Sequence, residues 1–213
     1  MPRECVEIED TWIFKTISFY NHMFYFVVFS RRAMTVKIAL ECALEASRYY
    51  KPDLVIFQFG VVDAVRRALP NYIRIPLQHI PLGQSFIRKT LQKNHRILTR
   101  LFNNHTTSRQ EFERITFNIS SHVLKEIKHV FIEIAQPGEY LAKQCYNAHE
   151  DINDYNLFFK KLEKSNCSVL KYPSDANFNE ILLKEDGHHL NPLGHEMVFS
   201  LVKQYFSNIF QQK

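Results

Sequence analysis

The sequence predicts a three-layer α/β fold built on a parallel sheet. Apolar strands alternate with amphipathic helices, beginning with a strand at 24–29, a helix at 34–49 and a second strand at 54–59. A strand–helix–strand unit of this length pairs its strands in parallel, because a parallel connection needs a crossover of a dozen or more residues. Two further short apolar runs, at 130–134 and 167–172, add strands to the same sheet.

The first half of the chain is interpreted element by element. Residues 1–10 predict a loop and residues 11–20 a helix. The run 24–29 is aromatic and β-branched between polar residues, which is typical of a buried strand. The helix that follows is predicted by apolar residues at helical spacing, which are Val36, Ala39, Leu40, Ala43, Leu44 and Ala46. Thr35 near its start is a candidate cap.

The second half mixes loops and helices around the remaining strands. Three prolines predict a loop over 71–81, and a strongly basic helical pattern follows over 84–102. Further helices are predicted over 109–128 and 151–164. A closing helix begins at Pro192, since proline fits the first turn of a helix, and it runs to about residue 206.

Composition bounds the class of protein. The chain has 213 residues, which predicts one domain spanning 1–213 with a sizeable core. Hydrophobic residues make up 46% and charged residues 23%, as in a globular protein. The net charge of +5 permits an anionic partner, but the basic residues are scattered and no nucleic-acid-binding motif accompanies them. A nucleic-acid partner is therefore not expected, and the oligomeric state stays open.

Cysteines and hydropathy indicate the compartment. The cysteines are widely spaced without a metal-binding pattern, and they are Cys5, Cys42, Cys145 and Cys167. Isolated buried thiols in a reducing compartment are the expectation. The apolar run 23–29 is too short to span a membrane, and no signal peptide is apparent. A cytoplasmic protein with no membrane span follows as the prediction, and no Cys/His cluster suggests a zinc site.

A candidate catalytic pair lies near the C-terminus, within the stretch 185–195. Asp186 and His189 are three positions apart on one tight loop, so the carboxylate can orient the imidazole. That is the acid–base half of a nucleophile–His–Asp triad. The alternative is a polar loop at the start of a helix, and His188 and His195 are neighbouring candidates for the base.

A second candidate segment follows the strand at 54–59. The chain breaks there at Gly60 and presents Asp63 just beyond. Ligands bind at the carboxyl ends of parallel strands, and both this segment and the loop with Asp186 and His189 follow strands on that side. The topology thus predicts that the two segments converge.

Together the two segments resemble the SGNH, or GDSL-type, hydrolase family over about residues 2–206. The Asp-x-x-His block of that family is matched by Asp186 and His189, and its Gly-x-Asn-Asp block is matched in part by Gly60 and Asp63. The resemblance implies a flavodoxin-like sheet of five parallel strands. It also implies a serine esterase or acyltransferase that acts on a small-molecule or glycan ester without metal or cofactor.

The sequence departs from the family pattern at the nucleophile. The Gly-Asp-Ser block is absent, and the resemblance places it, with the first and central strand of the sheet, just before Met1. The chain is then N-terminally incomplete. The alternative is that residues 2–10 are an ordinary polar leader. Ser30 is an internal candidate at a strand end, but it lacks the flanking Gly-Asp.

The oxyanion site also departs from the pattern, because Val62 occupies the position of the amide-bearing Asn. Backbone amides around Gly60, or Arg66, are the substitutes. Arg66 and Arg67 are either binding groups for an anionic acceptor or surface charge.

Two function hypotheses follow. The first is an SGNH-like hydrolase or acyltransferase for O-acyl esters, on a carbohydrate or surface glycan, with His189 and Asp186 catalytic and with Gly60, Asp63 and Arg66 in oxyanion or substrate binding. The second is a non-catalytic, truncated SGNH-like protein without its serine, which at most binds a glycan.

Overall fold

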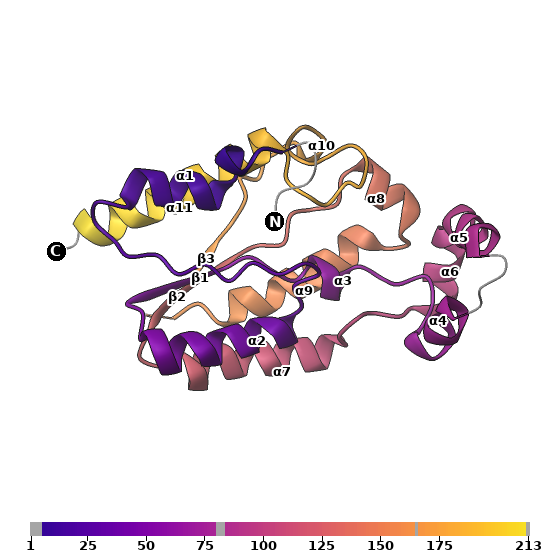
Figure 1. Ribbon diagram of the computed structural model, residues 1–213, viewed down its shortest axis with the longest axis horizontal. Coiled ribbons are helices and arrows are strands. Elements are labelled where there is room, and N and C mark those ends of the chain that lie inside the picture. Colours follow the sequence, from indigo (N-terminus) through magenta and orange to yellow (C-terminus); the bar gives the residue numbers. More distant parts are fainter. Residues whose placement is uncertain (1–5, 80–83, 165, 212–213) are drawn as a thin grey trace.

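A computed structural model describes residues 6–79, 84–164 and 166–211, and it contains a three-stranded parallel sheet flanked by helices (Figure 1). The strands are β1 (Leu54–Phe57), β2 (Lys128–Ile132) and β3 (Cys167–Leu170), in the order β1-β2-β3. Both pairings are parallel. The predicted α/β class with a parallel sheet is confirmed.

Helices make up most of the remaining structure. The first half of the chain holds a 3-10 helix η1 (Ile8–Asp10), α1 (Trp12–Tyr20), α2 (Val36–Glu45), a π-helical turn η2 (Ala46–Tyr50), α3 (Val61–Ala64), α4 (Asn71–Gln78), α5 (Gln84–Lys93) and α6 (His95–Phe102). The second half holds α7 (Arg109–Asn118), a π-helical turn η3 (Ile119–Val123), α8 (Glu139–Gln144), α9 (Ala148–Lys161), α10 (Phe178–Ile181) and α11 (Pro192–Gln211).

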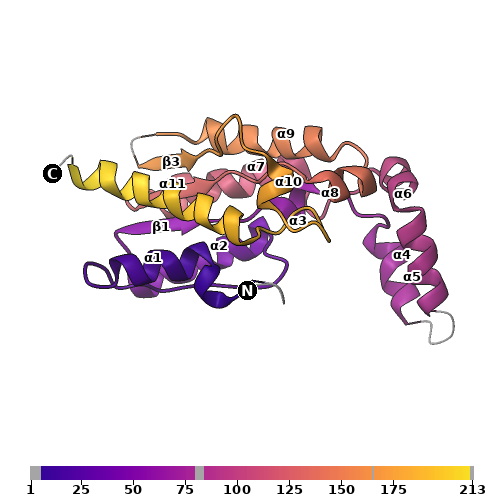
Figure 2. The same cartoon turned by 90° about the horizontal axis from the view of Figure 1, so that it is seen from above.

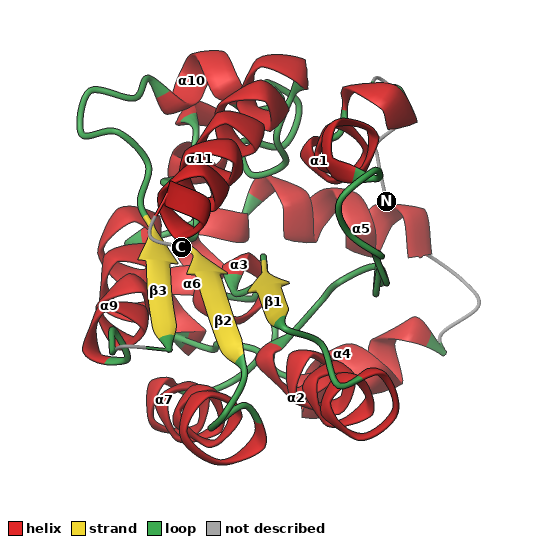
Figure 3. Ribbon diagram, turned by 90° about the vertical axis from the view of Figure 1, so that its left-hand side faces the viewer, coloured by secondary structure: helices red, strands yellow, loops and turns green. Residues whose placement is uncertain are grey.

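The sheet lies between two helical layers. Helices α1 and α11 cover one face, and α2, α7 and α9 cover the other (Figure 3). A hydrophobic core lies on each face of the sheet, and successive strand residues point into one core and then the other. Phe131 packs on the side of α7 and α9, and Ile132 packs on the side of α1 and α11. Because both faces are covered, the strands are mostly apolar, as expected of a parallel sheet, with Lys128, His129 and Ser168 as their polar members.

The prediction of a strand at 24–29 is wrong. The segment belongs to no helix or strand, and among the described residues β1 is an edge of the sheet. Its ends are held by aromatic contacts instead: the ring of Phe24 lies 5.7 Å from that of Phe206, and the ring of Phe29 lies 6.0 Å from that of Tyr50. Tyr25 between them is 92% exposed. A β-branched and aromatic run makes a strand only where a neighbouring strand is there to pair with it.

The prediction of a loop over 71–81 is also wrong for the described part, residues 71–79, which contains α4 with Pro76 inside it. Pro76 lacks the N–H that an interior helical residue donates, and the helix ends two residues later. The basic helix predicted over 84–102 is two helices, α5 and α6, that meet at Asn94.

Other boundaries shift by a few residues. The strand predicted at 54–59 ends at Phe57, and the helices predicted over 34–49 and 109–128 end in π-helical turns. The closing helix begins at Pro192 as predicted. Cys42, Cys145 and Cys167 are free and buried, and Cys5 lies outside the described residues. No described helix is long and apolar enough to cross a membrane.

Candidate functional site

The loop that carries Asp186 and His189 is tied together by its own backbone. The N–H of Leu183 donates to the carbonyl of His189, and the N–H of Gly187 donates to the carbonyl of Leu183, both at 2.8 Å. Gly187 has φ +67°, and a Cβ there would lie 2.7 Å from the backbone nitrogen of Leu141 in α8. Only glycine fits this left-handed, closely packed position, so the loop is held against α8.

Asn191 closes the loop and starts the next helix. Its side-chain amide donates to the carbonyls of Glu180 and Leu182, and its side-chain oxygen accepts the N–H of Gly194 in the first turn of α11. The Asn-Pro pair is therefore a helix cap that also fixes the loop.

Asp186 and His189 make the short contact that the sequence predicts. Oδ2 of Asp186 lies 2.7 Å from Nδ1 of His189. Oδ1 of Asp186 accepts the backbone N–H groups of His188 and His189, both at 3.0 Å. The carboxylate is thus fixed by three contacts, and Nε2 of His189 is the ring nitrogen on the side away from it.

The charge state of Asp186 suits it to orient a base. Partial burial pushes its pKa upward, but the hydrogen bonds from His189 and from the backbone amides outweigh burial and hold the pKa well below its usual value. An ionised carboxylate only accepts, so it requires the proton of a neutral His189 on Nδ1. The lone pair then lies on Nε2, the nitrogen that takes a proton from a nucleophile in a triad.

His188 shares the loop but makes longer contacts. Its Nδ1 lies 3.1 Å from the backbone oxygen of Asp186 and 3.4 Å from Oδ1. The rings of His188 and His189 are 4.0 Å apart. Among the described residues, these two histidines and Asp186 are the group that could hold a metal ion, with one ligand atom from each within 4.8 Å of the others. An ion bound by Nδ1 of His189 and Oδ2 of Asp186 would displace the proton between them.

His195 makes a structural contact between two helices. Its Nδ1 accepts the backbone N–H of Trp12 at 3.3 Å, and this joins the first turn of α11 to the first turn of α1. Burial, with the positive charge of Lys15 nearby, lowers the pKa of His195 to about 4. Only the neutral ring can accept from Trp12, so folding favours the neutral form.

This difference predicts a dependence of stability on pH. An unfolded histidine titrates near 6.5, so between about pH 6.5 and about pH 4 the unfolded chain binds the extra proton and stability falls as the pH falls. His195→Asn keeps an acceptor for Trp12 and removes the titration. We expect its urea midpoint to drop less than that of the wild type between about pH 7 and about pH 4.5. Equal drops would show that His195 carries none of the acid sensitivity.

The second segment begins at Gly60, where the chain leaves β1 and enters α3. Gly60 has φ +113°, and a Cβ at this position would lie 2.6 Å from Cδ1 of Ile134 and 3.6 Å from the ring of Phe112. The glycine is therefore required both by its backbone angle and by close packing. Val62, two residues on, has no side-chain donor for an oxyanion.

Gly60→Ala is expected to destabilise the protein by about 1–3 kcal/mol, because it combines backbone strain with overpacking against Ile134. Thermal or urea unfolding measures this loss. Ala64→Gly, at the end of the short helix that Gly60 precedes, is the comparison for a one-methyl change without a left-handed backbone. A Gly60→Ala variant as stable as the wild type would contradict the assigned backbone conformation.

Asp63 is buried completely and is bonded within the protein. Its Oδ2 accepts the N–H of Val36 at the start of α2, and its Oδ1 accepts the hydroxyl of Thr107 at 2.5 Å. Burial raises its pKa, and these hydrogen bonds oppose the rise. Asp63 thus links α3 to α2 and to the residues before α7, whereas the sequence placed it in substrate or oxyanion binding.

Arg66 is also bonded within the protein. Its Nε and Nη2 donate to the two carboxylate oxygens of Asp151 at 2.6 and 3.0 Å, and Arg109 donates to the same carboxylate at 2.7 Å. Arg66 is 8% exposed and Asp151 is fully buried. This ion pair fixes the segment after α3 on α9, and a role of Arg66 in substrate or oxyanion binding stays a prediction.

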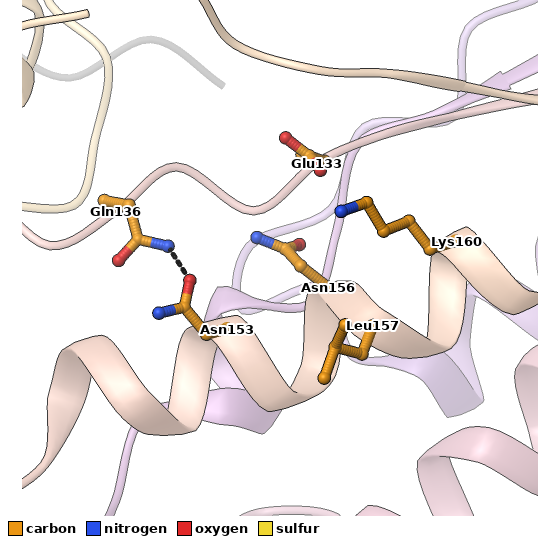
Figure 4. Close-up of a pocket in the computed structure, with 6 residues that line it drawn as sticks. All are labelled: Glu133, Gln136, Asn153, Asn156, Leu157 and Lys160. Atoms are coloured by element: carbon orange, nitrogen blue, oxygen red, sulfur yellow. Dashed lines mark hydrogen bonds between the residues drawn. The ribbon is translucent and has the colours of Figure 1, made fainter. Parts of the chain in front are cut away.

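Two pockets lie near these segments. The larger, about 370 Å³, adjoins the loop of Asp186 and is lined by Gly138, Glu139, Tyr140, Lys143, Asn179, Leu182, Leu183, Lys184 and Gly187. The smaller, about 220 Å³, lies between the residues after β2 and α9 (Figure 4). The side-chain amides that line it already form hydrogen bonds within the protein: Gln136 donates to Asn153, and Asn156 bonds the backbone of Ile134. The larger pocket is the better placed for a group bound beside the loop.

Sequence reasoning missed Asp151, which holds Arg66, and the capping role of Asn191. Asp151 lies beside Ile152 in a predicted amphipathic helix, and both side chains are buried. An acidic residue among the apolar positions of that helix was the signal that it has a buried partner. For Asn191 the signal was the Asn-Pro pair itself.

Comparison with known proteins places the fold. No family model matches the sequence, and no curated protein matches it. A solved structure of an acetyl xylan esterase is similar, with a TM-score of 0.59 and 18% identity over 92% of this chain and 91% of that chain. At this identity the likeness shows a shared fold, and it extends over nearly the whole of both chains.

Proposed function

We propose that this protein is an SGNH-like hydrolase that cleaves, or transfers, an O-acyl group of a carbohydrate or surface-glycan ester. His189 is the general base and Asp186 orients it. The observation that carries the proposal is the 2.7 Å contact between Oδ2 of Asp186 and Nδ1 of His189, on a carboxylate that two backbone amides also hold. The fold shared with an acetyl xylan esterase supports an ester substrate.

In the proposed reaction a serine hydroxyl attacks the ester carbonyl while Nε2 of His189 takes its proton. The imidazolium that forms is stabilised by the ionised Asp186. The same proton then passes to the leaving sugar oxygen, and water or a second sugar hydroxyl releases the acyl group. Backbone amides around Gly60 are the proposed oxyanion donors, because Val62 offers none from its side chain. Asp63 and Arg66 support that segment from inside the protein.

The proposed nucleophile is a serine hydroxyl. None of the five glycines is followed by Asp-Ser, so the family resemblance assigns this role to no serine of the printed sequence. Ser30, which is exposed, is the internal candidate.

A fluorophosphonate probe tests the proposal, because it reacts with an activated serine. The probe is applied to the 213-residue chain and to the protein purified from its own cells, and the labelled peptide is identified by mass spectrometry. Hydrolysis of p-nitrophenyl acetate and acetate release from acetylated xylan are measured on the same samples. Labelling that disappears in His189→Ala supports the proposal, and the modified peptide identifies the serine.

A second candidate function is binding of a glycan without catalysis. It is favoured by the missing Gly-Asp-Ser and by Val62 at the amide position. Neither labelling nor turnover in either sample, together with binding of xylan oligosaccharides, would replace the hydrolase by this second function.

A further inference from the structure

A helical arm extends from the end of the α/β body. It consists of α4, α5 and α6, and we call residues 71–79 and 84–102 the basic arm. The three helices lie beyond the sheet in Figure 1, and α4 and α5 point away from the body in Figure 2. α6 packs on α5 and α8, so α6 joins the arm to the body.

The charge of the basic arm has one sign only. Its sequence contains no Asp and no Glu, and its six basic residues are Arg74, Arg88, Lys89, Lys93, Arg96 and Arg100. The whole chain has 27 basic and 22 acidic residues, so a one-sign segment of this length stands out from the rest. The arm therefore suits a negatively charged partner.

The orientation of α6 shows which of its faces a partner would meet. Nη1 of Arg96 donates to the carbonyl of Ala142 at 2.7 Å, and the guanidinium of Arg100 lies over the ring of Tyr146 at 5.3 Å. These cationic side chains make contacts with the body. Ile97 and Leu101 are about 100° further round the helix, and they are 66% and 72% exposed. The outward face of α6 is thus apolar, the reverse of an ordinary surface helix.

The same exposure recurs on the other helices of the arm. Tyr72 and Ile75 on α4 are 75% and 49% exposed, and Phe86 on α5 is 74% exposed. Lys89 and Lys93 on α5 are exposed as well. Exposed large apolar side chains on helices that also carry exposed cations are the composition of helices that lie in a membrane interface.

We propose that the basic arm docks the protein on an anionic lipid bilayer. The apolar side chains enter the boundary between headgroups and acyl chains, and the lysines contact anionic headgroups. A nucleic acid fits less well, because it has no place for Ile97 and Leu101 and because Arg96 and Arg100 face the body. A second copy of the arm would bring like charges together. No described helix can cross a membrane, so the attachment is peripheral.

Vesicle flotation tests this docking on the full chain. The probes are vesicles of phosphatidylcholine alone and of phosphatidylcholine mixed with phosphatidylglycerol. We expect the protein to float with the mixed vesicles, at least about tenfold more strongly than with the neutral ones, and we expect high salt to weaken the binding. Equal partition to both, or to neither, would overturn the proposal.

An added tryptophan locates the contact. Trp12 is the only tryptophan of the chain and is 7% exposed, so it gives a constant background. In Phe86→Trp the emission should shift to the blue when mixed vesicles are added. If the Phe86→Trp variant floats but its emission does not move, another surface binds the lipid, and the basic arm would be the wrong assignment.

Paired substitutions separate the lipid from other partners. Ile97→Gln/Leu101→Gln and Lys89→Gln/Lys93→Gln should each weaken binding to mixed vesicles about tenfold or more. The control is Leu44→Gln/Leu157→Gln, which changes two leucines of the body that are 48% and 50% exposed. It should float like the wild type, and all three variants should keep the wild-type circular dichroism.

Two other outcomes would replace the lipid. Binding of random DNA that Lys89→Gln/Lys93→Gln abolishes and Ile97→Gln/Leu101→Gln leaves unchanged, without flotation, would make the arm a nucleic-acid site. A dimer in sedimentation that Ile97→Gln/Leu101→Gln converts to a monomer, again without flotation, would make it a contact between copies. Neither outcome bears on ester hydrolysis, which the serine probe tests separately.

Discussion

Asp186→Asn is expected to lower kcat for ester hydrolysis about 10⁴-fold and to leave the fold intact. The amide oxygen can still accept the N–H groups of His188 and His189, so the loop keeps its two backbone bonds. The amide nitrogen, however, faces Nδ1 of His189 as a donor. The imidazole then carries its proton on Nε2 and can no longer take one from the serine.

The tautomer is measurable apart from turnover. Nitrogen NMR of the imidazoles should show His189 protonated on Nδ1 in the wild type and on Nε2 in Asp186→Asn. Glu185→Gln is the matched control, since it removes the same charge from the adjacent, exposed residue. Loss of activity below about tenfold in Asp186→Asn would exclude His189, held by Asp186, as the base.

Asp151→Ala is expected to destabilise the protein by about 3–5 kcal/mol. Arg66 is 8% exposed and donates twice to Asp151, so truncation leaves a buried guanidinium without its carboxylate. The loss is a large part of the about 5–15 kcal/mol that stabilises a typical domain. Urea unfolding followed by circular dichroism measures it.

Asp154→Ala is the control, because Asp154 pairs with Arg109 at the surface and the loss of that pair should stay below about 1 kcal/mol. The double change Arg66→Met/Asp151→Leu should recover most of the stability, since a buried ion pair is often replaced by apolar side chains at little cost. Asp151→Ala and Asp154→Ala of equal stability would mean that Arg66 finds water in the folded protein.

The strands of the sheet were predictable because local pattern and tertiary context agree there. The runs around Val55, Val130 and Val169 are apolar and short, and each is a strand in the sheet. The run 24–29 has the same composition but is no strand, because strand formation depends on a neighbour that local sequence does not reveal. Pro76 led to the opposite error, because a loop was predicted where a helix forms. A helix of eight residues accepts a proline near its end.

The site was predictable to the extent that it is local. Asp186 and His189 are three residues apart, so their contact follows from one turn of chain. The partner of Arg66 was not predictable, because Asp151 lies 85 residues further along the sequence. Whether Arg66 met solvent or a buried carboxylate depended on how α9 packs.

The basic arm lies within the connection between β1 and β2, which runs from Phe57 to Lys128. The entropy lost when a flexible connection closes grows only with the logarithm of its length, and halving the length changes it by about 0.6 kcal/mol. The arm makes up nearly half of this connection. Its presence therefore raises the entropic cost of pairing β1 with β2 by roughly 0.6 kcal/mol. The same insertion lengthens the search for the β1–β2 contact, and folding should be slowed more than stability is reduced.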